Sequence, residues 1–179
     1  MFVDFFKRFF STPREPEMKS IEYRGGVVTF RIPAHWREEY SGIEGGIFYG
    51  DHSHSGTLRL SIITVAKPIQ SKPASALDVL ETIVNGLKND GVVGTTEVLK
   101  DGNALFKYEE ATSERGRRLT IFYRIVVNPV QPHHARVATF SFTILASQRA
   151  RSQVQRDLEM LSAEIEAASF SPKLGLVAE

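Results

Sequence analysis

A strand that stops at a proline is the feature that most constrains this chain. Residues 30–36 have the sequence FRIPAHW, in which an apolar extended run ends at Pro33 and the only tryptophan, Trp36, follows in the turn. Proline fixes φ and donates no backbone hydrogen bond, so it is disfavoured inside a sheet. Gly45 and Gly46 then precede a second short aromatic strand. These elements indicate a sheet scaffold, in which we expect Trp36 to anchor the core or the turn.

Length and composition are those of an ordinary soluble domain. A chain of 179 residues, with 42% hydrophobic and 24% charged residues, is long enough for one domain with a sizeable core. The net charge of +1 argues against a strong preference for nucleic acid. Because the chain has no cysteine, disulfides, thiolate catalysis and cysteine-based zinc sites are excluded.

Strand patterns dominate the chain, and turn residues connect the last of them into hairpins. Strands are predicted at 27–32, 46–49, 58–66, 95–100, 104–111, 119–127 and 137–145. Asp101-Gly102-Asn103 favours a tight turn and Ser113-Glu114-Arg115-Gly116 a longer one, because glycine tolerates positive φ. The last four strands should therefore form an antiparallel meander.

Two amphipathic helices are predicted at about 73–89 and 149–168, from apolar residues spaced three and four apart. The first should begin near Pro73 or Ser75 and end just before Gly91. The predicted fold is α+β, a central antiparallel sheet packed by helices. We expect an amino-terminal segment and linker at 1–20, a single domain at 21–172 and a tail at 173–179.

The amino-terminal sequence MFVDFFKRFF places its phenylalanines at helical spacing, opposite most of the charges. These residues are Phe2, Phe5, Phe6, Phe9 and Phe10. The charges and the lack of a small-residue cleavage site argue against a signal peptide, and we expect a cytoplasmic location. The segment either docks on the domain's own apolar surface, anchors the protein to a membrane or partner, or forms a frayed tail.

The element order, the FRIPAHW turn, the double glycine and a final helix ending in Ala168-Ser169-Phe170 resemble the Mog/PsbP-like superfamily, including its bacterial DcrB-type members. The resemblance covers about residues 21–172. It implies an antiparallel sheet between helices and a mostly non-enzymatic binding role. The chain lacks the signal sequence and lipobox cysteine of the envelope lipoproteins, and no functional residue is transferred.

Alternation along the strands predicts one apolar sheet face and one mixed face of hydroxyl, cationic and aromatic side chains. We assign Leu119, Ile121 and Tyr123 to the apolar face. The mixed face is predicted to contain Arg59, Thr120, Phe122 and Arg124. It would be partly open and would receive a partner segment, unless it is simply solvated or covered by the amino-terminal segment.

Arginines gather at the start of the last predicted helix, where they oppose the helix dipole. Arg149 and Arg151 are therefore further candidates for a partner contact, although solubility and nearby carboxylates such as Asp157 and Glu159 are the favoured explanation.

Histidines offer the main hint of metal chemistry. His52 and His54 lie in one loop and are weak candidates for a chelating pair, but firm sites normally need three protein ligands. If the first helix is a crossover, the His133 loop lies at the opposite end of the sheet, near His35. No catalytic triad or phosphate loop is recognisable. We therefore predict no metal, no cofactor and no catalytic residue.

These observations favour a non-enzymatic protein-binding, assembly or chaperone-like module whose partner is a protein or peptide. Two alternatives stay open at this point. One is a small-molecule or metal-binding enzyme that uses the histidine loops. The other is a peripheral membrane factor anchored by its phenylalanine-rich start.

Overall fold

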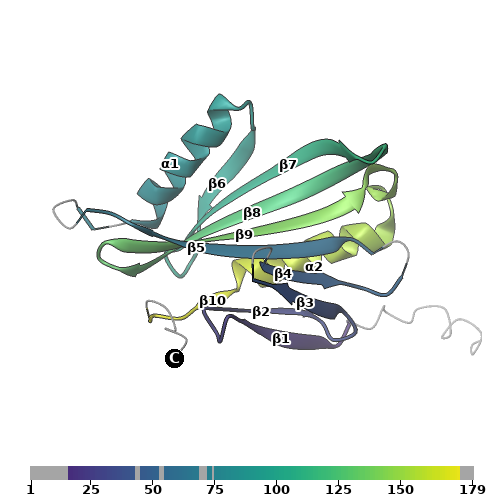
Figure 1. Cartoon of the computed structure of the whole chain (residues 1–179), viewed down its shortest axis with the longest axis horizontal. Helices are drawn as coiled ribbons and strands as arrows, with labels where there is room; N and C mark the ends of the chain where they lie inside the picture. The colour runs from purple at the N-terminus through teal and green to yellow at the C-terminus, as the bar shows by residue number, and fades with distance from the viewer. Residues whose placement is uncertain (1–15, 43–44, 53–54, 69–71, 74, 174–179) are drawn as a thin grey trace, which may run out of the picture.

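The chain folds into a seven-stranded antiparallel sheet, a three-stranded sheet and two α-helices. The computed structural model describes residues 16–42, 45–52, 55–68, 72–73 and 75–173. Figure 1 shows the long strands of the large sheet crossing the molecule, with α1 and the small sheet on opposite sides of them. The predictions made for the phenylalanine-rich segment and for His54 lie outside the described residues.

The large sheet has the strand order β3-β4-β5-β9-β8-β7-β6, with every neighbouring pair antiparallel. The predicted meander of the last four strands is confirmed. Its members are β3 (Arg37–Ser41), β4 (Gly45–Tyr49), β5 (Thr57–Ala66), β6 (Gly94–Val98), β7 (Ala104–Glu114), β8 (Arg117–Gln131) and β9 (His134–Leu145). Gly102 and Gly116 both have positive φ in the hairpin turns, as the turn chemistry predicted.

The small sheet pairs β1 (Met18–Tyr23) with β2 (Val28–Pro33), and β10 (Ser169–Phe170) joins the other side of β2. Pro33 is the last residue of β2, as its missing backbone donor predicted. The sequence prediction missed β1, β3 and β10. β3 has a polar, charged sequence typical of an edge strand, and β10 has only two residues. In β1 only two buried residues, Ile21 and Tyr23, alternate with exposed ones, too short a pattern to predict a strand.

One hydrophobic core lies between the large sheet, the small sheet and α2 (Ser152–Glu166), which follows a short 3-10 turn at Ala146–Gln148. The Phe30 ring from β2 makes edge-on contacts with Phe48 and Phe140, at centroid distances of 5.4 and 5.3 Å. Trp36 stacks on Phe142 with centroids 6.3 Å apart and is buried. Its predicted role as a core anchor is confirmed.

A second core lies under α1 (Ala76–Asn89), on the other face of the large sheet. The Ser75 side chain caps α1 by accepting a hydrogen bond from the Asp78 amide at 3.0 Å. Val79, Leu80 and Val84 point from α1 onto the sheet. Helices therefore cover both faces, which confirms the predicted α+β fold. Within the described residues, no helix is long and apolar enough to cross a membrane.

Candidate functional site

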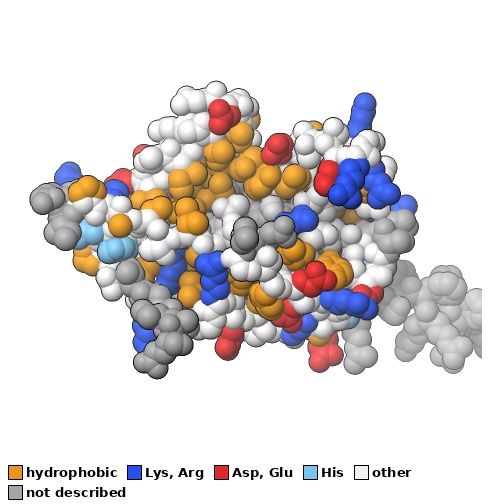
Figure 2. Space-filling model, in the orientation of Figure 1, with side chains coloured by type: hydrophobic (Ala, Val, Ile, Leu, Met, Phe, Trp, Pro, Cys, Tyr) orange, Lys and Arg blue, Asp and Glu red, His pale blue; other side chains and the backbone are white. Residues whose placement is uncertain are grey.

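The first candidate site lies on the face of the large sheet that carries α1, in the half of that face that α1 does not reach. Along β9, residues 135–138 are buried on both faces, whereas from Thr139 onward buried and half-buried positions alternate. The cause is the length of α1, which packs on β7 and β8 and on the first part of β9 only. Beyond α1, none of the described residues covers this face. Figure 2 shows hydrophobic side chains gathered beside α1 over these strands.

The strand register fixes which side chains share this open face. Residues that pair directly across neighbouring strands place their side chains on the same face, and one such row runs across the sheet from β4 to β7. The row contains Ile47, Arg59, Ser141, Tyr123 and Tyr108. Neighbouring positions on the same face add Ser61, Ile63, Ile121, Thr139 and Thr143. We call these ten residues the open face.

Two tyrosines form the aromatic part of the open face. The Tyr108 and Tyr123 rings are stacked, with centroids 4.5 Å apart and an angle of 9° between the planes. The pKa of Tyr108 is raised to about 12, mainly by burial and to a smaller extent by the neighbouring Tyr123 and Glu110. Burial raises the pKa of Tyr123 in the same direction. Both phenols therefore stay protonated at neutral pH and can donate hydrogen bonds, and the Tyr123 hydroxyl interacts in this way with Glu110.

The predicted mixed face does not exist as one surface, and this prediction is wrong. Arg59 lies on the open face, but Thr120, Phe122 and Arg124 lie on the opposite face. Phe122 is paired with Phe142 and Arg124 with Phe140, both of which belong to the core beneath α2. The prediction assigned the two faces of β8 the wrong way round relative to β5 and β9.

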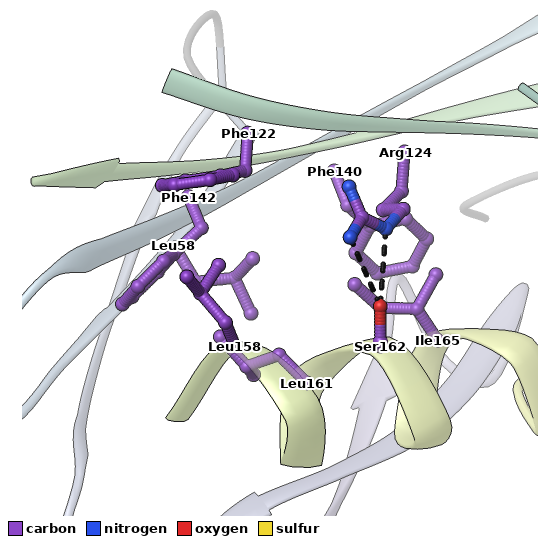
Figure 3. A pocket seen from close by; sticks show the side chains of 9 residues that line it. All are labelled: Leu58, Phe122, Arg124, Phe140, Phe142, Leu158, Leu161, Ser162 and Ile165. Atoms are coloured by element: carbon purple, nitrogen blue, oxygen red, sulfur yellow. Dashed lines mark hydrogen bonds between the residues drawn. The ribbon is translucent and has the colours of Figure 1, made fainter. Parts of the chain in front are cut away.

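Figure 3 shows how this part of β8 is occupied: side chains of α2 rise toward Phe122, Phe140 and Phe142, and the Arg124 guanidinium reaches Ser162. Its Nε and Nη2 atoms donate to Ser162 Oγ at 3.2 and 3.0 Å. The gap that remains has a volume of about 10 Å³, room for at most one water. Phe122 and Thr120 are each 6% exposed, so they offer almost no surface to a partner.

The two arginine candidates near α2 differ in their contacts. Arg149 Nη2 lies 2.6 Å from Glu109 Oε2, and its guanidinium lies over the Phe122 ring at 5.7 Å. Arg151 is exposed and occupies the amino-terminal cap position of α2 without a side-chain cap. Both residues precede the helix, which starts at Ser152 and not at 149. A partner contact for either stays a prediction.

The second candidate site is a groove on the other side of the molecule, where α2 meets the end of β2 and the start of β1. Its volume is about 830 Å³. It is lined by Pro16, Met18, Arg31, His35, Trp36, His52, Gln153, Arg156, Asp157, Met160, Ala163 and Glu164. We call this the α2 groove.

Two histidines and a buried carboxyl group meet at the α2 groove. The His35 and His52 rings stack with centroids 6.1 Å apart. Asp157 is 6% exposed and accepts a hydrogen bond from Gln153 Nε2 at 2.8 Å. Burial raises the pKa of Asp157, while Gln153 and the nearby histidines oppose that shift. Within the described part of the chain, no group of three potential ligands is placed to hold a metal ion.

The predicted separation of the histidine loops is confirmed, but the position of His35 is not. Thr57, which follows the His52 loop, pairs with Thr143, whereas His134 pairs with Ala66 at the other end of β5. His35 was expected near His133 and instead stacks on His52. Its position depends on the small sheet, whose outer strands β1 and β10 were not predicted.

Solved structures share this fold. No protein-family model matches the sequence, and no curated protein matches it. A protein from Bacteroides thetaiotaomicron matches with a TM-score of 0.60 and 16% identity over 88% of this chain and 50% of that one, so this chain spans about half its length. LpqN, involved in cell envelope biogenesis of Mycobacterium tuberculosis, matches with a TM-score of 0.59 and 18% identity, over 87% of this chain and 91% of that one.

A mutant of the protein Mog1 matches with a TM-score of 0.50 and 9% identity, over 86% of this chain and 96% of that one. These likenesses establish the fold that the sequence resemblance predicted. The narrower likeness to DcrB-type members stays a prediction.

Proposed function

We propose that this chain, with its Mog1/PsbP-like fold, is a non-enzymatic protein-binding module whose open face receives a protein or peptide partner. The observation that carries the proposal is the incomplete cover of the large sheet by α1. A sheet face that retains half-buried aliphatic and aromatic side chains, yet no covering layer among the described residues, provides apolar area for association.

The chemistry of the open face suits recognition of a polypeptide. Tyrosine combines a large apolar ring with a hydrogen-bonding hydroxyl and is enriched at interfaces. The stacked pair Tyr108 and Tyr123 holds its two rings in one fixed arrangement, which limits the side-chain entropy lost on binding. Arg59 is exposed in the same row, where it supplies a cation, and the hydroxyl side chains of β9 supply further polar contacts.

Capture from a lysate tests the proposal with variants that leave the core intact. Ile63 is 60% exposed and lies beside Ser61 and Arg59 on the open side of α1. A second cross-strand row starts at Ile63 and ends at Val98, which lies on the other side of α1 and is 61% exposed. Ile63→Glu and Val98→Glu are therefore matched in size, exposure and change of charge.

We expect the tagged full-length protein and Val98→Glu to retain the same stoichiometric protein, identified by mass spectrometry. Ile63→Glu and Arg59→Glu should reduce its recovery at least tenfold, which corresponds to about 1.4 kcal/mol of binding free energy. Equal recovery by all folded variants would contradict binding at the open face. The cytoplasmic location stays part of the proposal.

A further inference from the structure

The α2 groove has an apolar floor and a charged rim. Trp36 is buried at its base, and Met18 and Met160 are half-buried beside it. Methionine side chains adapt to the shape of an incoming apolar group and make favourable contacts with aromatic rings. The rim carries charges of both signs, with Arg156 exposed and Glu164 paired to Arg31 through two hydrogen bonds of 2.9 and 2.6 Å. Such a groove fits an amphipathic segment that presents aromatic side chains.

The described part of the chain begins at this groove. Pro16 and Met18 both line it, so residues 1–15 are attached directly to its wall. Their first ten residues contain five phenylalanines on one predicted helical face, and Asp4, Lys7 and Arg8 mostly on the other. The chain therefore has an aromatic, amphipathic segment connected to the edge of an apolar groove.

We propose that residues 1–10 occupy the α2 groove of their own chain, with the phenylalanines directed at Met18, Trp36 and Met160. Residues 11–15 span up to about 17 Å when extended, and they start from Pro16, which itself lines the groove. A tether this short gives an effective concentration on the order of millimolar, so the intramolecular contact needs little intrinsic affinity. The segment's three charged residues match a rim that also carries both signs.

This proposal is independent of partner binding at the open face. The α2 groove lies on the side of the large sheet covered by α2 and the small sheet, whereas the open face lies on the side of α1. A failure of one proposal therefore leaves the other intact.

A spin label in the groove tests the docking, because the chain has no native cysteine to compete for the label. A nitroxide is attached to Ala163→Cys, at an exposed position of the groove wall, in full-length protein labelled with nitrogen-15. The control carries the nitroxide at Ser61→Cys, which is exposed on the open face. The amide signals of residues 2–10 are compared before and after reduction of the nitroxide.

We expect the label at Ala163→Cys to broaden these signals at least twofold more than the label at Ser61→Cys. A second variant, Phe5→Ser with Phe9→Ser, should abolish that difference while leaving the signals of α2 in place. Equal broadening from the two label positions would overturn the proposal. So would broadening in a mixture of spin-labelled and separate isotope-labelled copies, because that result assigns the groove to the segment of a second copy.

Discussion

The two faces of the large sheet differ in how completely they are covered. On one face, α2 and the small sheet bury Leu58, Phe140 and Phe142 in a continuous core. On the other face, α1 buries a smaller cluster that includes Phe106 and Ile125, and no described residue covers the far half of the sheet. Stability is therefore concentrated on the first face, while the second has surface left for binding. Substitutions on the two faces should affect different properties.

Adjacent residues of β9 give the largest expected contrast. Phe140 is fully buried against Phe30, so Phe140→Ala should lower the free energy of unfolding by about 3–5 kcal/mol through lost contacts and a cavity. Ser141 points to the open face, and Ser141→Ala should change it by less than about 0.5 kcal/mol. Urea unfolding measures both. Similar losses for the two variants would refute the difference between the faces.

Arg136 extends the comparison to the end of the covered face. It is 1% exposed, and its guanidinium donates hydrogen bonds to the carbonyl oxygens of Ser171 and Lys173. Arg136→Ala removes two charge-assisted hydrogen bonds and should cost about 3 kcal/mol in urea unfolding. Arg118 is exposed on the neighbouring strand, and Arg118→Ala serves as the control, with almost no expected change. Equal values for the two variants would show that the buried guanidinium contributes nothing to the covered face.

The Ser75 cap tests the incomplete cover on the other face. Ser75→Ala removes the hydrogen bond to the Asp78 amide and should destabilise α1 by about 1 kcal/mol. Hydrogen exchange should then increase in α1 more than in α2. Ser75→Asp retains a capping oxygen and should preserve the original exchange rates. Equal increases in the two helices after Ser75→Ala would show that the two covering layers do not open separately.

The smallest expected effect is a dependence of the free energy of unfolding on pH, caused by Asp157. Because burial raises its native pKa, the folded protein retains a proton that the unfolded chain has already lost. The contribution of Asp157 to the free energy of unfolding should therefore fall as pH rises from below about 4, the ordinary pKa of aspartate, through the raised native pKa. Asp157→Asn removes this titration, so urea unfolding should show its stability relative to wild type increasing over that range. A constant difference between the two proteins would contradict the raised pKa.

Turn chemistry made the meander predictable from the sequence, but the faces of β8 were not assigned correctly. Apolar side chains occur on both faces of β8, such as Ile121 on one and Phe122 on the other, so alternation alone does not tell which face is covered. The register of β8 against β9 decides it, because Phe122 pairs with Phe142. A β-bulge between Pro129 and Gln131 shifts this register next to the β8–β9 connection, so it could not be counted from the turn.

The α2 groove could not be predicted because it is built from elements far apart in the sequence. Its histidines come from the β2–β3 and β4–β5 connections, and Asp157 comes from α2. Asp157 lies on the buried side of α2. The helix was predicted from the spacing of its apolar residues, and that spacing does not indicate that a carboxylate is buried. No local pattern connects these residues.

Partner binding at the open face is tested most directly by the reactivity of a single cysteine there, in the free protein and in the complex captured from lysate. Ser61→Cys introduces that thiol, and Ser20→Cys places a control thiol at an exposed position of β1. We expect maleimide to label both thiols in the free protein, and the partner to protect position 61 but not position 20. Unchanged reactivity at position 61 in the complex, or the absence of any stoichiometric complex, would contradict partner binding at this face.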